Sequence, residues 1–258
     1  MFSKVYSYGV QGLEAYLMTI EIDASKGLPA TIIVGLPDNA IKESKERVRS
    51  AIKNSGYKYT LGRITVNLSP ADTKKEGPSF DLPVALGILA ATEQIDPNIL
   101  EKYAILGELS LDGKIQPIRG ALPIAIAISK NPRFRGLIVP LSNATEAAAV
   151  NGINVYGMRD LNEVVAFLQN PDQTSAVKID IAELMQQRNH YDIDFADVKG
   201  QTLIKRGLEI AAAGGHNCLL MGSPGSGKSM LSQRLPTIIP DITIKEALEV
   251  TQIYSSWG

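Results

Sequence analysis

The feature that most constrains the fold of this chain is a glycine-rich segment in its C-terminal part. It reads Gly222-Ser223-Pro224-Gly225-Ser226-Gly227-Lys228-Ser229 and matches the phosphate-binding pattern G-x-x-x-x-G-K-[ST] in full. Such a loop needs glycine because it takes backbone angles that a Cβ forbids, and because phosphate oxygens approach its main chain closely. The segment therefore predicts a nucleoside triphosphate site on an α/β module.

The sequence on both sides of this loop supports the same prediction. Residues 218–221 form a short apolar run that indicates a buried strand, with Cys218 in the core. Residues 228–235 indicate the start of a helix that ends at Pro236. In such a module Lys228 reaches the β- and γ-phosphates and the Ser229 hydroxyl holds Mg²⁺, so we expect ATP and Mg²⁺ as cofactors.

The composition excludes several classes of protein. The 258 residues are 45% hydrophobic and 21% charged with a net charge of −1, which suits one large or two modest globular domains. No apolar run approaches the ~18 residues of a membrane span, and the first residues lack a signal-peptide profile. The single cysteine excludes an internal disulfide framework. We expect a cytoplasmic protein without a membrane partner.

Residues 1–170 are predicted to form one α/β domain. Alternating patterns at 15–22, 30–34 and 63–68 indicate strands. Asp38 is a candidate N-cap for a helix that runs to about Asn54, and residues 81–92 indicate a second helix that is apolar nearly all round and therefore buried. The Asp112-Gly113 pair predicts a turn within a hairpin over 103–118. Further helices are expected at 122–129, 144–150 and 161–168, and further strands at 137–139 and 154–156.

The remaining third of the chain is predicted to contain a linker and the start of a second domain. Residues 171–190 are polar and indicate a linker with a short helix at 181–187, and residues 191–258 begin the nucleotide-binding module with a helix at 201–213. Hydrolysis needs carboxylates at the end of a later strand. The acids after Ser229 are Asp241, Glu246 and Glu249, and none follows a strand-like run. We therefore expect an N-terminal portion, truncated before the Walker B segment, that holds no catalytic residue and does not hydrolyse ATP by itself.

Motifs along the whole chain resemble those of one family. They include D-F-A-D-V-K-G-Q at 194–201, E-I-A-A-A-G-G-H-N at 209–217, G-L-P-D at 35–38, N-L-S-P-A-D at 67–72 and G-P-S-F-D-L-P at 77–83. The family is that of the Mg-chelatase-related AAA+ proteins called YifB or ComM. The resemblance implies a hexameric ATPase, whose ComM members are helicases that migrate DNA branches during natural transformation. It also implies that the Walker B, sensor and arginine-finger residues lie beyond Gly258.

The resemblance leaves two activities open for the full-length protein and adds nucleotide contacts. Because AAA+ cores are similar, the alternative to a DNA motor is a Mg-chelatase-type ATPase that remodels a protein or a pigment-biosynthesis complex. The family places the segment around Val198 and Gly200 against the adenine and ribose, which implies a role for both residues at the base. His216 is implied there more loosely, and a plain helix-end residue is the alternative for it.

Residues 1–170 also resemble the Lon protease domain, whose α+β fold is ribosomal protein S5 domain 2-like. Glu76-Gly77-Pro78-Ser79 is similar to the segment that carries the nucleophilic serine of Lon, and residues 107–120 are similar to the stretch before its catalytic lysine. In a Ser–Lys dyad the lysine is the base, and its position here falls on Leu122, which cannot take a proton. We expect a proteolytically inactive domain in which Ser79 is a helix N-cap or a loop residue.

A basic stretch gives this domain a candidate surface for branched or single-stranded DNA. Residues 42–63 carry seven basic groups against two acids, and Lys42, Arg49 and Lys53 recur at helical spacing. Clustered lysine and arginine on one face suit phosphate contacts, and Lys74 and Lys75 are candidates to extend the cluster. The alternative is an ordinary solvated helix face on which Glu43 and Glu46 balance the charge.

Overall fold

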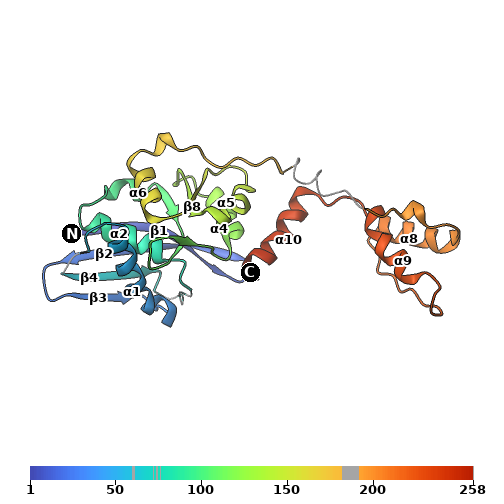
Figure 1. Ribbon diagram of the computed structural model, residues 1–258, viewed down its shortest axis with the longest axis horizontal. Helices are drawn as coiled ribbons and strands as arrows, with labels where there is room; N and C mark the ends of the chain where they lie inside the picture. The colour runs from blue at the N-terminus through green and yellow to red at the C-terminus, as the bar shows by residue number, and fades with distance from the viewer. Residues whose placement is uncertain (60–61, 72, 74, 76, 182–191, 258) are drawn as a thin grey trace. The chain divides into compact units, whose positions relative to one another are not determined.

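The computed structural model describes residues 1–59, 62–71, 73, 75, 77–181 and 192–257. The chain is mixed α/β, as predicted, and divides into two compact units (Figure 1). The first comprises Met1–Ile179 with Leu248–Gly258, and the second comprises Asp180–Ala247. Within the described ranges, no helix has both the length and the apolar character that crossing a bilayer requires.

A seven-stranded sheet, largely parallel, organises the first unit. Its strand order is β3-β4-β2-β1-β5-β8-β9, in which only the β1–β2 and β2–β4 pairs are antiparallel. The strands are β1 (Phe2–Gln11), β2 (Glu14–Ser25), β3 (Ala30–Val34), β4 (Arg63–Ser69), β5 (Tyr103–Ile105), β8 (Gly136–Pro140) and β9 (Val155–Met158). A small antiparallel pair, β6 (Glu108–Leu109) and β7 (Ile115–Gln116), forms a second sheet.

Helices cover the two faces of the large sheet unequally. One core cluster joins the sheet to α1 (Asn39–Asn54), α2 (Asp81–Ala91), α3 (Pro97–Leu100) and α6 (Leu161–Gln169). The other joins β1, β5, β8 and β9 to α4 (Ala121–Ser129) and α5 (Leu141–Ala148), and its described members include no residue of β3 or β4. Neighbouring strand residues such as Leu137 and Ile138 belong to different clusters because successive side chains of a strand point to opposite faces.

Several predicted elements of this unit are confirmed. Helix α1 begins after Asp38, whose carboxylate accepts a 2.8 Å hydrogen bond from the amide of Ile41. Helix α2 is buried at every position, as its all-round apolar sequence predicted. The turn at Asp112 and Gly113 also forms, and Gly113 takes a φ of +87° that favours glycine.

The hairpin predicted over residues 103–118 is wrong in part, and β1 was missed. Residues 103–105 pair in parallel with β1 and β8, so only β6 and β7 flank the turn. Strand β1 lacks a regular alternation of apolar and polar residues, because serines occupy positions on the face that packs against α2. Ser3 is buried and donates a 2.7 Å hydrogen bond from Oγ to the carbonyl of Gly87 in α2.

The second unit is small and helical among its described residues. It contains η2 (Phe195–Asp197), α8 (Thr202–Gly214), α9 (Lys228–Arg234) and η3 (Leu235–Ile238), and α10 (Ile244–Trp257) begins in it. Its core is a cluster of four buried residues: Phe195, Val198, Leu208 and Leu231. The first part of the expected linker, including η1 (Pro171–Gln173), belongs to the first unit, and residues 182–187 of the expected linker helix lie outside the described residues.

The strand expected at residues 218–221 does not form. The described part of the second unit contains no strand, and Leu219 and Met221 are 81% and 85% exposed. Cys218 is exposed too, so its predicted place in a core is wrong for this structure. A strand needs a neighbour for its backbone groups, and none is present among the described residues of this unit.

Candidate functional sites

The glycine loop has the backbone conformation that a phosphate cradle requires. Gly225 and Gly227 have φ values of +81° and +84°, which side-chain-bearing residues rarely adopt. A Cβ on Gly222 would lie 3.0 Å from Oγ of Ser226, so a larger residue would fill the space. Successive amides in such alternating conformations form an anion-binding concavity, and α9 begins directly after Gly227.

The side chain of Lys228 lies along this loop. Its ammonium donates hydrogen bonds of 2.9 Å and 2.8 Å to the carbonyls of Gly222 and Ser223, and one of 3.3 Å to Oγ of Ser226. The Lys228 ammonium thus lies beside the loop, where a cation can form charge-assisted hydrogen bonds to the β- and γ-phosphates of a bound nucleotide. The exposed Ser229 follows and lines a 440 Å³ cavity together with Lys228 and Cys218. These residues fit a magnesium-bound nucleoside triphosphate, in which Ser229 would hold the metal ion.

The segment predicted to meet the base touches the loop through a residue that sequence reasoning did not select. Nε2 of Gln201 lies 3.4 Å from the carbonyl of Ser226, to which it donates. Val198 is 3% exposed and belongs to the core of this unit, whereas Gly200 is exposed with a φ of +72°. Gln201 also has a positive φ, and it is the N-cap residue of helix α8.

The acids after the loop are not arranged for hydrolysis in the described part of the chain. Among described residues after Ser229 there is no strand at whose end a carboxylate could point toward Mg²⁺. Glu246 instead accepts bonds of 2.7 Å and 2.8 Å from the amide and hydroxyl of Thr243, and these lower the pKa of its carboxyl. This arrangement is a helix-start contact.

Ser79 lines a cavity of about 1010 Å³ in the first unit, together with Glu108 and Arg119. Ser79 is a loop residue rather than an N-cap, since Phe80 holds the N-cap position of α2. The carbonyl of Ser79 accepts a 2.9 Å hydrogen bond from the amide of Gly107. Leu122 lies in the first turn of α4 and is fully buried in the core. The described lining of the cavity includes neither lysine nor histidine, so it offers no Lon-type lysine base for Ser79.

An ion pair between the partly exposed Arg47 and the buried Asp81 connects α1 to the start of α2. Nε and Nη2 of Arg47 lie 2.8 Å and 3.3 Å from the two carboxylate oxygens of Asp81, and the amide of Leu109 donates at 3.4 Å. Burial raises the pKa of Asp81 to about 6, although Arg47 acts in the opposite direction. Arg47 is therefore paired with Asp81 and only partly exposed, so the basic stretch loses one of its predicted free surface charges.

Helix α1 presents the remaining basic side chains to solvent. Lys42, Arg49 and Lys53 are all exposed, and the guanidinium of Arg49 lies 5.9 Å from the ring centre of Tyr59. Lys75, considered as an extension of this patch, is fully buried, and its ammonium donates to the carbonyl of Pro70. Lys74 lies outside the described residues. Lys42, Arg49 and Lys53 on α1 are therefore the described residues of the candidate nucleic-acid surface.

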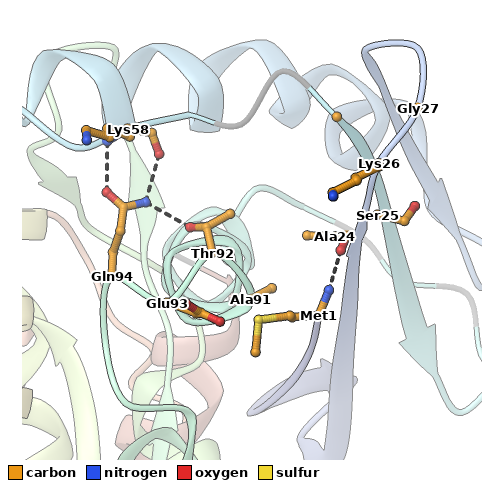
Figure 2. Close-up of a pocket in the computed structure, with 11 residues that line it drawn as sticks. Met1, Ala24, Ser25, Lys26, Gly27, Lys58, Ala91, Thr92, Glu93 and Gln94 are labelled. Atoms are coloured by element: carbon orange, nitrogen blue, oxygen red, sulfur yellow. Dashed lines mark hydrogen bonds between the residues drawn. The ribbon is translucent and has the colours of Figure 1, made fainter.

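A second cavity, of about 610 Å³, lies where β2 and α2 end (Figure 2). Gln94 bridges its wall, because its side chain accepts from the amide of Lys58 at 2.9 Å and donates to the carbonyl of the same residue at 2.8 Å. Nε2 of Gln94 also donates to Oγ1 of Thr92 at 2.8 Å. These bonds fasten the chain after α1 to the end of α2, a structural role that the sequence pattern did not indicate.

Both units resemble magnesium-chelatase proteins. Residues 20–143 match the family described as "Subunit ChlI of Mg-chelatase", and residues 194–258 match "Magnesium chelatase, subunit ChlI". The chain is 42% identical over 252 residues to competence protein ComM of Haemophilus influenzae and 43% identical over 259 residues to the uncharacterized protein YifB of Escherichia coli.

These two alignments cover 97% and 98% of this chain but 49% of each relative, so the chain spans about half the length of the curated relatives it matches. A more distant relative is Lon protease 2 of Bacillus subtilis, which is 30% identical over 132 residues. That alignment covers 50% of this chain and 23% of the Lon protein.

Proposed function

Because the chain belongs to the magnesium-chelatase-related family of ComM and YifB, we propose that it is the N-terminal portion of an ATP-dependent AAA+ motor. The motor would act as a branch-migration helicase on DNA in the cytoplasm and assemble as a hexamer. The glycine loop with its inward lysine carries this proposal. Bound ATP would supply free energy through hydrolysis of its terminal phosphate, and no described carboxylate of this chain is placed for that step.

Within this chain, each group of the loop has a separate task. The amides around Gly225 and Gly227 would hold phosphate oxygens, while Lys228 would exchange its contacts with Gly222 and Ser223 for the β- and γ-phosphates. Ser229 would ligate Mg²⁺. Gln201 would keep the segment that contains Val198 and Gly200 beside the loop.

The exposed basic face of α1 supports DNA as the substrate. Lys42, Arg49 and Lys53 are exposed cations on a single helix, which suits contacts to a phosphate backbone. The first unit would then position DNA and have no protease activity, because Leu122 stands where a Lon-type base is required.

A Mg-chelatase-type ATPase that remodels a protein or pigment-biosynthesis complex is the second candidate. It is favoured by the matches themselves, since residues 20–143 and 194–258 both match chelatase subunit descriptions. The two candidates share the nucleotide site and differ only in what activates it.

The deciding experiment measures ATP hydrolysis by the full-length protein with and without a four-way DNA junction. Lys228→Ala is the inactive control, and Lys130→Ala, which alters an exposed lysine of the first unit outside the loop and α1, is the matched control. We expect stimulation by the junction that Lys228→Ala removes. A hydrolysis rate that is unchanged by DNA but increased by a porphyrin-handling partner would favour the second candidate. The absence of hydrolysis would contradict both candidates.

A further inference from the structure

The segment that precedes α8, residues 195–201, is held beside the phosphate loop at both of its ends. Val198 is 3% exposed and packs in the core of the second unit with Leu231 of α9, the helix that follows the loop. At the other end, Nε2 of Gln201 donates to the carbonyl of Ser226 within the loop. A nucleotide whose phosphates occupy the loop therefore has this segment as a close neighbour.

Lys205, in the first turn of α8, makes further contacts with the same segment. Its ammonium donates a 3.0 Å hydrogen bond to the carbonyl of Val198 and lies 5.4 Å from the ring centre of Phe195. Its backbone amide donates to the carbonyl of Gln201 at 2.9 Å. A hydrogen bond from a charged donor is about twice as strong as a neutral one. Lys205 therefore fastens the main chain of the segment to α8 at two points.

The main chain between these two points is available to a ligand. Lys199 and Gly200 are exposed, and their peptide groups make no hydrogen bond with any described residue. Gly200 and Gln201 have φ values of +72° and +52°, and a Cβ on Gly200 would meet nothing within 4 Å. Peptide N–H and C=O groups are strong donors and acceptors. Here they are exposed, without partners among the described residues, and anchored on both sides.

We propose that Lys205 is a positioning residue that sets the base preference of the nucleotide site, an inference that rests on the nucleotide binding proposed above. By holding the carbonyl of Val198, Lys205 fixes the direction in which the peptide groups of Lys199 and Gly200 meet the edge of the base. Adenine carries an amino donor where guanine carries a carbonyl acceptor. Main-chain groups fixed in one orientation distinguish the two bases, because the wrong base leaves them unpaired.

Calorimetric titration of the full-length protein with ADP, GDP and inorganic pyrophosphate, each with Mg²⁺, tests this role. ADP and pyrophosphate differ only in the nucleoside, so their comparison separates base binding from phosphate binding. Lys205→Met keeps an unbranched apolar stem without the donor. It should weaken ADP binding about tenfold, reduce the preference for ADP over GDP and leave pyrophosphate binding unchanged. Lys205→Arg, which keeps a charged donor, should retain most of the affinity for ADP.

Arg206→Met is the matched control, since Arg206 is the next residue of α8 but is exposed and pairs with Glu209 at 3.0 Å. It should change none of the three affinities. If Lys205→Met leaves ADP binding unchanged, or weakens ADP and pyrophosphate equally, the role of Lys205 is overturned while the nucleotide site stands. A wild-type protein that binds neither ADP nor pyrophosphate would overturn the proposed function, and this inference with it. Far-UV circular dichroism checks that each variant is folded.

Discussion

Replacement of Arg47 by methionine should destabilise the first unit in a way that depends strongly on pH. Asp81 is 1% exposed and Arg47 supplies its cation through bonds of 2.8 Å and 3.3 Å. Methionine keeps much of the side-chain volume but leaves the carboxylate buried without a counter-charge. Breaking a buried pair from one side costs about 3–5 kcal/mol when the remaining group is ionised.

The size of the effect at each pH follows from the protonation of Asp81. Its folded pKa of about 6 lies above the ordinary aspartate value of 3.8, so the folded state binds the proton more tightly. In the wild type this contribution to stability is present at low pH, decreases between about pH 4 and 6, and is flat above that range. Removing Arg47 raises the folded pKa of Asp81 further. At pH values above that pKa, each added pKa unit lowers the free energy of unfolding by about 1.4 kcal/mol.

We therefore expect Arg47→Met to lose about 1 kcal/mol at pH 5, where Asp81 is largely protonated in both proteins. At pH 8 the expected loss is about 4 kcal/mol, which includes about two further pKa units of ionisation cost. The assay is urea unfolding followed by tyrosine fluorescence, because seven of the nine tyrosines lie within residues 1–170.

Two controls isolate the carboxylate as the cause. Arg159→Met removes an exposed pair with Glu163 and should cost less than about 1 kcal/mol at either pH. Adding Asp81→Asn to Arg47→Met should abolish the pH dependence, because no titrating group remains buried there. Equal losses for Arg47→Met at pH 5 and pH 8, or a pH dependence that survives Asp81→Asn, would refute the reasoning.

Three further outcomes are expected. Gly35→Ala should lower the free energy of unfolding in urea by more than about 2 kcal/mol, because its Cβ would lie 2.0 Å from the carbonyl oxygen of Leu68. Gly12→Ala, also at positive φ but in open space, should cost about 1 kcal/mol. Equal costs for the two variants would contradict this reasoning. A fluorophosphonate probe should label Ser79 no faster than background, and labelling that Ser79→Ala removes would contradict the inactive state of this serine. Reversal of Lys42, Arg49 and Lys53 to glutamate should flatten the slope of log K for DNA against log salt, and an unchanged slope would exclude α1 as the contact.

The candidate nucleotide site was largely predictable because its signals are local. The spacing of Gly222, Gly227 and Lys228 is a property of eight consecutive residues, and the positive φ values at the glycines follow from it. The N-cap at Asp38 and the buried helix α2 were likewise predictable from short runs of consecutive residues. What local sequence could not supply is the contact of Gln201 with the loop, since it joins residues 25 positions apart.

The sequence by itself therefore determined most helix starts and most strands of the α/β sheet, and it predicted the phosphate loop and the absence of a Lon-type base at Leu122. Tertiary structure alone decided that β1 lies within the sheet, that residues 103–105 join it in parallel, and that residues 218–221 remain without a strand partner. It also turned Arg47 inward to Asp81 and left β3 at an open edge. The physical reason is that strand order, burial and ion pairing depend on residues distant in sequence, whereas turns, caps and glycine conformations depend on neighbours.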